Sequence, residues 1–305
     1  MPTHLVWFRA DLRIHDNFAL AAACRAKDAN VLALFIATPE QWRQHDMAPR
    51  QAALLSAYLN DLQHSLAEKG IPLIYKEAHD FAAQRQTVQA ICQQHAVTHL
   101  YYNYQYEFNE QQRDRQLEKT LAGVVCEGFD DSVMLAPGSV MTGSHEMYKV
   151  FTPFKNAFIK RLKEGLPECV TAPSVRGETI TDLPAIRLNY PQQSFDETVF
   201  PASEKAAIAR LRQFCTQGAA EYEARRDFPA TEGTSRLSAC LALGALSPRQ
   251  CLHRLLAEQP QALDGGAGAV WLNELIWREF YRHLMTYHPD LCKHRPFIRW
   301  TEQVQ

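Results

Sequence analysis

The sequence lacks the patterns that mark metal proteins, disulfide-stabilised secreted proteins and membrane proteins. Its eight cysteines are scattered and include no CxxC pair, so we expect neither a metal site nor a disulfide framework. No stretch approaches the roughly 20 apolar residues that a membrane-spanning helix needs. Charged residues interrupt the N-terminus where a signal peptide would have its apolar run. We therefore expect a cytoplasmic protein without a membrane partner.

A charge excess and a glycine-rich first turn are also missing. The net charge of -2 gives no sign of a broadly basic nucleic-acid binder and leaves room only for a local basic patch. After the first apolar run the chain reads RADLRIHDN, whereas a dinucleotide-binding turn needs glycines at this point. We therefore do not expect the N-terminal part to bind NAD or FAD in the usual Rossmann manner.

What the first 130 residues do contain is an alternation of short apolar runs and amphipathic stretches. Continuous apolar runs are typical of parallel strands that are buried on both faces. The pattern predicts a Rossmann-like, doubly wound α/β unit with a parallel sheet. The expected strands are residues 4–9, 31–36, 71–76, 99–103 and 123–126, and the expected helices are 48–69, 81–95 and 109–122.

The remaining residues divide into a connector and a helical part. Residues 151–165 form a basic amphipathic pattern that predicts a helix. Five prolines between 166 and 202 indicate an irregular connector. Beyond it, helices are expected at 205–215, 218–226, 248–257 and 267–287, and a further helix is expected to begin at residue 238. The predicted division is an α/β domain at 1–135, a connector at 136–202 and part of an all-α domain at 203–305.

Three segments combine side chains that could carry chemistry. Residues 7–17 (WFRADLRIHDN) place arginines and aspartates at a strand end, which fits either ion pairing or a function. Residues 233–238 (GTSRLS) offer hydroxyls, a guanidinium and backbone N–H groups for an anion, or simply a helix cap. In 267–287, one face carries Trp271, Glu274, Trp277, Arg278 and Tyr281; this mixture suits a cavity wall, the alternative being a solvent-exposed helix.

These strings, together with CEGFDDSV and WLNELIWREFYRH, resemble the photolyase/cryptochrome family over essentially the whole chain. The likeness is greatest to the enterobacterial class I members, which act on cyclobutane pyrimidine dimers. The resemblance implies light-dependent repair of UV-damaged DNA by electron transfer from reduced FAD. It also implies 5,10-methenyltetrahydrofolate as an antenna and a monomeric protein.

The resemblance also assigns roles to residues of this chain. The residues implied to contact FAD are Tyr222, Thr234, Ser235, Arg236, Leu237, Ser238, Trp271 and Arg278. The catalytic pair would be Glu274, which hydrogen-bonds the dimerised bases, and Trp277, which stacks on them. DNA contacts would come from Arg226, Glu274, Trp277 and Tyr281. The folate would be bound by His45, Asn109, Glu110, Cys292 and Lys293.

Two other functions stay open on sequence grounds. A cryptochrome-type photoreceptor shares the fold, although Glu274 and Trp277 favour repair. An inactive fragment that binds only the antenna chromophore is the second alternative. The helical domain of the family continues beyond residue 305, so we expect a C-terminally truncated chain that binds FAD weakly. We also expect residues after about 200 to be partly disordered or prone to aggregation.

Overall fold

The computed structural model describes residues 1–298, 300 and 301 of the chain. The strands are β1 (Thr3–Phe8), β2 (Asn30–Ala37), β3 (Leu73–Glu77), β4 (Val97–Asn103) and β5 (Val125–Phe129). The α-helices are α1 (Phe18–Ala23), α2 (Pro39–Gln44), α3 (Pro49–Ala67), α4 (Phe81–Gln94), α5 (Phe108–Thr120), α6 (Phe151–Glu164), α7 (Glu204–Gln217), α8 (Tyr222–Arg225), α9 (Ser238–Leu243), α10 (Pro248–Glu258) and α11 (Ala269–Tyr287). Two 3₁₀ helices are η1 (Ala262–Asp264) and η2 (Pro289–Lys293). Of the expected helical part, residues 299 and 302–305 lie outside the described residues.

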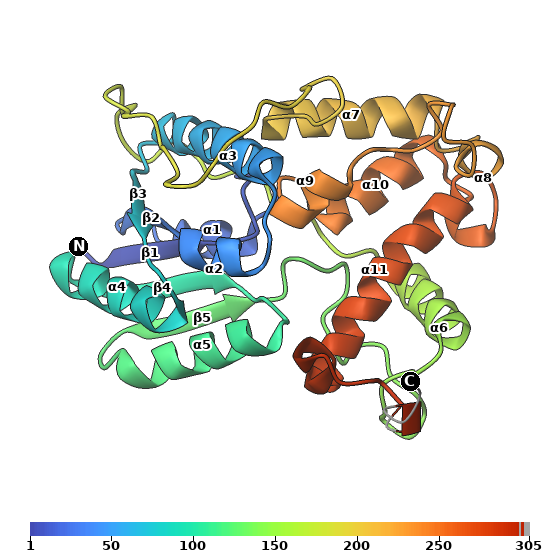
Figure 1. Cartoon of the computed structure of the whole chain (residues 1–305), viewed down its shortest axis with the longest axis horizontal. Helices are drawn as coiled ribbons and strands as arrows, with labels where there is room; N and C mark the ends of the chain where they lie inside the picture. The colour runs from blue at the N-terminus through green and yellow to red at the C-terminus, as the bar shows by residue number, and fades with distance from the viewer. Residues whose placement is uncertain (299, 302–305) are drawn as a thin grey trace.

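The sheet is parallel throughout, with the strand order β3-β2-β1-β4-β5 (Figure 1). Helices α1 and α3 cover one face, and α4 and α5 cover the other. The apolar runs become central strands because side chains on both of their faces are buried. The predicted α/β class is confirmed. The order reverses between β1 and β4, and such switch points are where open α/β sheets bind ligands.

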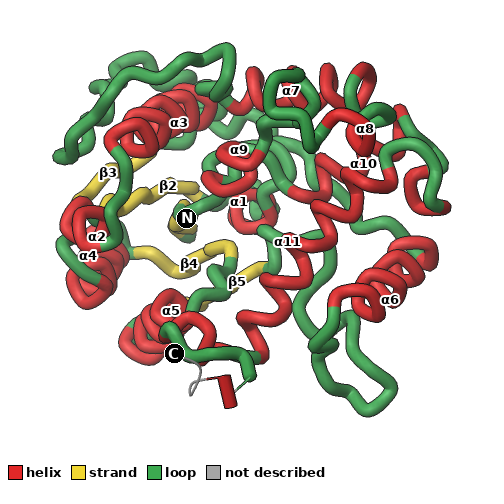
Figure 2. Tube along the Cα trace, turned by 45° about the vertical axis from the view of Figure 1, so that its right-hand side comes forward, coloured by secondary structure: helices red, strands yellow, loops and turns green. Residues whose placement is uncertain are grey.

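The helices α6–α11 pack beside the sheet and share its core (Figure 1). Phe154 and Phe158 of α6 are fully buried and contact Phe280 and His283 of α11. After α11 the chain returns toward α5, which η2 contacts (Figure 2). None of the helices in the described range is long and apolar enough to cross a membrane.

The proline-rich connector has no helix or strand between 165 and 203, as the sequence predicts. It is nevertheless anchored. The Arg176 guanidinium donates hydrogen bonds to the carbonyls of Cys24, Ala26 and Ala29, and Ile186 and Leu188 are buried. The three-part division into domains stays a prediction, since the core runs continuously from the sheet into the helices.

Several expected elements differ from those observed. β5 begins at Val125 instead of residue 123, because Gly123 has φ +80° and belongs to the preceding turn. The expected helix at 218–226 is only the short α8, which follows a turn. Helices α1 and α2 have six residues each and have no counterpart in the sequence prediction. The region after 200 contains packed helices, and the expectation that the isolated chain is partly disordered or prone to aggregation there stays a prediction.

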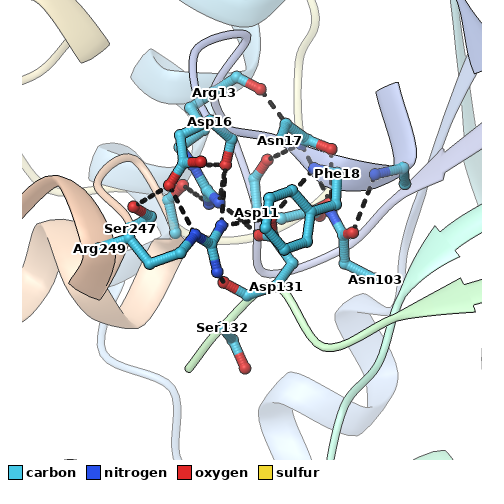
Figure 3. A network of polar contacts seen from close by, with 12 residues as sticks. Asp11, Arg13, Asp16, Asn17, Phe18, Asn103, Asp131, Ser132, Ser247 and Arg249 are labelled. Carbon is cyan, nitrogen blue, oxygen red and sulfur yellow. Dashed lines mark hydrogen bonds and ion pairs between the residues drawn. The ribbon is translucent and has the colours of Figure 1, made fainter. Parts of the chain in front are cut away.

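A buried polar network joins the sheet to the helices (Figure 3). Arg249, at the start of α10, pairs with Asp16 at 3.0 Å and with Asp131 at 2.9 Å. Arg13 pairs with the same Asp131 and donates to the Gly244 carbonyl at 2.9 Å. All four charged side chains are at most 1% exposed. The ion-pairing interpretation of residues 7–17 therefore holds for Arg13 and Asp16.

Removing one partner from this network should destabilise the protein strongly. The change Arg249→Met leaves Asp16 and part of Asp131 buried without a counterion, which costs roughly 3–5 kcal/mol. The matched control is Arg254→Met on the same helix. Its pair with Glu258 is about one-third exposed on both sides and should cost less than about 1 kcal/mol. Urea unfolding of both variants measures the difference; equal losses would contradict the assignment.

Candidate functional site

A cavity lies at the carboxyl edge of the sheet, at the switch point between β1 and β4. Its volume is about 640 Å³, which is the size of a small-molecule site. The loop after β1 contributes Arg9 and Ala10, and the segment from β4 into α5 contributes 105 and 107–110. The helical part closes it with Leu243, Met285 and Cys292. We call this the sheet-edge cavity.

Four of the five residues that the sequence predicts for a folate line this cavity. They are His45, Asn109, Glu110 and Cys292. The fifth, Lys293, lies next to it, with its Nζ 3.8 Å from the ring centroid of Phe108, which is a lining residue. Burial raises the pKa of Glu110. The fold thus brings together residues that are separated by more than 240 positions in the chain.

The floor of the cavity contains two buried arginines that the sequence prediction missed. Arg9 and Arg113 both bind Asp114 at 2.8 Å, and their guanidinium carbons lie 4.9 and 4.6 Å from the Trp7 ring. Burial, and next the charge of Arg9, lower the pKa of Arg113 to about 10. Arg9 belongs to the WFRADLR string that the sequence analysis singles out, but the sequence assigns it no role in a cavity. Arg113 lies within an otherwise ordinary polar helix, which gives no signal.

A second cavity of about 310 Å³ lies beside α8 and the residues before α9. We call it the arginine-lined cavity, because Arg210, Arg225 and Arg236 line it. Thr234 and Ser235 line it too. Leu237, by contrast, is buried in the core, and Ser238 faces a separate cavity with Ala239 and Ala242. Of the predicted segment, residues 233–236 thus line this cavity, and the anion cradle stays a prediction.

None of the five residues predicted on this face of α11 lines any of the cavities described here, so the expectation of a cavity wall stays a prediction. Trp271 is in the core, with its ring centroid 5.0 Å from that of Phe214. Further along, Glu274 pairs with Arg226 at 2.5 Å, and the Arg226 guanidinium lies 5.9 Å from the Tyr222 ring. These three polar residues and Trp277 form a partly exposed group, which we call the α11 surface.

The rest of the predicted face connects α11 to the loop after β5. Arg278 donates to the Ser132 carbonyl at 2.6 Å, and burial lowers its pKa to about 10. Tyr281, in contrast, is 54% exposed and lies next to Trp277, with ring centroids 5.7 Å apart. Arg278 is thus placed as an anchor of the helix in this structure, whereas Tyr281 belongs to the α11 surface.

Behind this surface, two buried titratable groups fix α11 to the same loop. Glu279 accepts a hydrogen bond from the Met134 backbone N–H at 2.8 Å, and burial raises its pKa to about 7. His283 meets the Leu135 carbonyl at 2.9 Å, and burial lowers its pKa to about 4. Neither residue is marked by the sequence pattern, because on a helical projection both fall on the apolar side.

The fold and the cavities define an α/β protein with a ligand cavity at its switch point, closed by a helical unit that carries an aromatic and charged surface. Comparison with known proteins identifies the class. The DNA photolyase family model matches residues 4–173, which is more than half of the chain. The chain belongs to the DNA photolyase family.

Individual relatives agree with this family. The deoxyribodipyrimidine photo-lyases of Escherichia coli K12 and Salmonella typhimurium LT2 are each 71% identical over 100% of the chain. The crystal structure of a Synechocystis cryptochrome superposes with a TM-score of 0.81 at 25% identity, covering 95% of this chain and 62% of that one. The chain spans 65% of the length of the two photo-lyases.

Glu279 gives a prediction about pH. Its folded pKa of about 7 lies above the usual 4.5, so its protonated form stabilises the fold at low pH and this contribution is lost as pH rises to 7. Relative to the wild type, Glu279→Gln should gain about 3 kcal/mol between pH 5 and pH 8. Urea unfolding at both values measures this. A flat profile for Glu279→Gln would contradict the assignment.

Proposed function

We propose that this chain contains the antenna unit and one wall of the reaction site of a light-dependent enzyme that repairs cyclobutane pyrimidine dimers in DNA, acting as a cytoplasmic monomer. The observation that carries the proposal is the α11 surface. There the fold gathers Arg226, Glu274 and Trp277, three side chains that suit phosphate, base edge and base ring respectively. Residues 226 and 274 come from different helical segments and meet only in the folded chain.

The α11 surface has the chemistry for a base taken out of the DNA stack. Trp277 supplies an aromatic plane, and base–aromatic stacking contributes about 1–3 kcal/mol. Glu274 supplies a carboxyl group for hydrogen bonds with the polar edge of the dimer. Arg226 supplies a guanidinium for a phosphate; in the free chain it binds Glu274, so DNA binding requires an exchange of partners. A dimer is already poorly paired, which lowers the cost of flipping it out.

The arginine-lined cavity fits the diphosphate of FAD. Thr234 and Ser235 offer hydroxyl donors and Arg236 a guanidinium. Tyr222 lies nearby, with its ring centroid 6.0 Å from that of Phe214, a lining residue. When bound and reduced, FAD would supply the electron that splits the dimer. Trp271 and Arg278 would support FAD binding indirectly, by holding α11 in place.

The sheet-edge cavity fits a folate antenna such as 5,10-methenyltetrahydrofolate. A pterin is a flat ring with an edge of N–H donors, and Glu110 offers a half-buried carboxylate for that edge. Trp42 and Phe108 offer apolar surface to the ring. Residues from α2, α5 and η2 all line this cavity. That convergence supports antenna binding by the chain even in the alternative of an inactive fragment.

Folate binding gives a direct test of the sheet-edge cavity. Asn109→Ala should weaken binding about tenfold, because it removes a side-chain hydrogen bond at the rim. Gln112→Ala is the matched control, since Gln112 is an exposed amide on the same helix and is not a lining residue. Titration followed by the absorbance band of the reduced folate measures both affinities. Equal weakening, or none, would count against this site.

DNA binding tests the α11 surface. Arg226→Ala should weaken binding to damaged and undamaged duplexes equally and lower the salt dependence by about one counterion. Trp277→Ala should lower the affinity for dimer-containing duplex about tenfold or more and leave undamaged duplex unaffected. Arg212→Ala, on the exposed side of α7, serves as control. A wild-type chain that binds both duplexes equally, with FAD supplied, refutes the proposed function; light-dependent loss of dimers would extend it to catalysis.

A further inference from the structure

Phe151, the first residue of α6, lies flat on Trp277. The two ring centroids are 3.5 Å apart and the ring planes differ by 7°. None of the other aromatic contacts among the described residues combines so short a distance with so small an angle. Aromatic pairs prefer offset or edge-to-face arrangements, so this face-to-face contact reflects how the two helices hold the rings rather than the attraction between them.

The contact is held by the packing of α6 against α11. Phe151, Phe154 and Phe158 follow one another along one side of α6 at helical spacing. The two deeper residues meet α11 at steep angles, for example Phe154 against His283 at 75°. Phe280 also contacts Phe151 edge-on, at 6.0 Å and 75°. The row is fully buried at Phe154 and reaches the surface only at Phe151, where the contact becomes parallel.

We propose that Phe151 is a positioning residue for lesion recognition: it covers one face of the Trp277 indole and fixes the plane of the ring. An extruded base then stacks on the part of the half-buried indole that Phe151 leaves uncovered, beside Tyr281, whose ring centroid lies 5.7 Å from that of Trp277 at an angle of 22°. A ring at 3.5 Å leaves no space for a base on the covered face. A free tryptophan on a helix surface would rotate about its two side-chain torsions and would lose that freedom on stacking. Phe151 removes this cost in advance. The inference rests on the proposed role of Trp277.

The first experiment needs no DNA. Time-resolved fluorescence anisotropy of Trp277, taken as the difference between each protein and its Trp277→Phe counterpart, measures how firmly the indole is held. Phe151→Leu should add a fast motion, whereas Phe151→Tyr, which keeps a ring, should not. Phe154→Leu is the matched control, because it loosens the same helix pair without touching Trp277. Unchanged motion in Phe151→Leu overturns the proposal.

The second experiment compares binding to a duplex with one thymine dimer and to the same duplex undamaged. Phe151→Leu should lose about tenfold in affinity for the damaged duplex only, and Phe151→Tyr should retain it. In a Trp277→Ala background, Phe151→Leu should cause no further loss, because it acts through the missing indole. Additive losses, or equal losses on both duplexes, overturn the proposal. If the wild type does not discriminate, the proposed function fails, and the anisotropy result alone decides whether Phe151 orders Trp277.

Discussion

The structure depends on a cluster of charges that are buried together between the sheet and the helices. Arg13 and Arg249 share Asp131, and Asp16 completes the set (Figure 3). Burying an unpaired charge is costly, so each of these groups is tolerated only while its partners are in place. The turn after β1, the loop after β5 and the start of α10 must therefore adopt their positions together.

The positions of both candidate sites follow from that constraint. The turn after β1 continues from Arg9, which is on the floor of the sheet-edge cavity. The loop after β5 continues from Asp131 into 132–135, which receives Arg278, Glu279 and His283 of α11. The sheet-edge cavity and the α11 surface are thus built on neighbouring segments that one network holds.

The sequence predicts the features of this structure that depend on residues close together in the chain. It does not predict the features that depend on contacts between distant residues. The strands are predictable because each is a continuous apolar run, and the connector because its prolines exclude regular structure. Arg249 gives no such signal, since its partners lie 118 and 233 positions away. Trp271 is misjudged for a related reason: helical periodicity groups it with Glu274, but only tertiary packing decides that Phe214 covers it. The five residues predicted for a folate follow from the family resemblance, whereas the position of Arg113 at the sheet-edge cavity is visible only in the fold.

Two buried titratable groups attach α11 to the loop after β5, and their contributions to stability depend on pH in opposite directions. Glu279 has its pKa raised to about 7, so its contribution to stability falls as pH rises from 4.5. His283 has its pKa lowered to about 4, so its contribution rises with pH up to its usual value of 6.5. Between pH 4.5 and pH 6.5, the two contributions to the free energy of unfolding change with pH in opposite directions and by similar amounts. Both side chains bind the backbone of the same loop, one turn of helix apart, so their contributions to the stability of this attachment oppose each other over that range of pH.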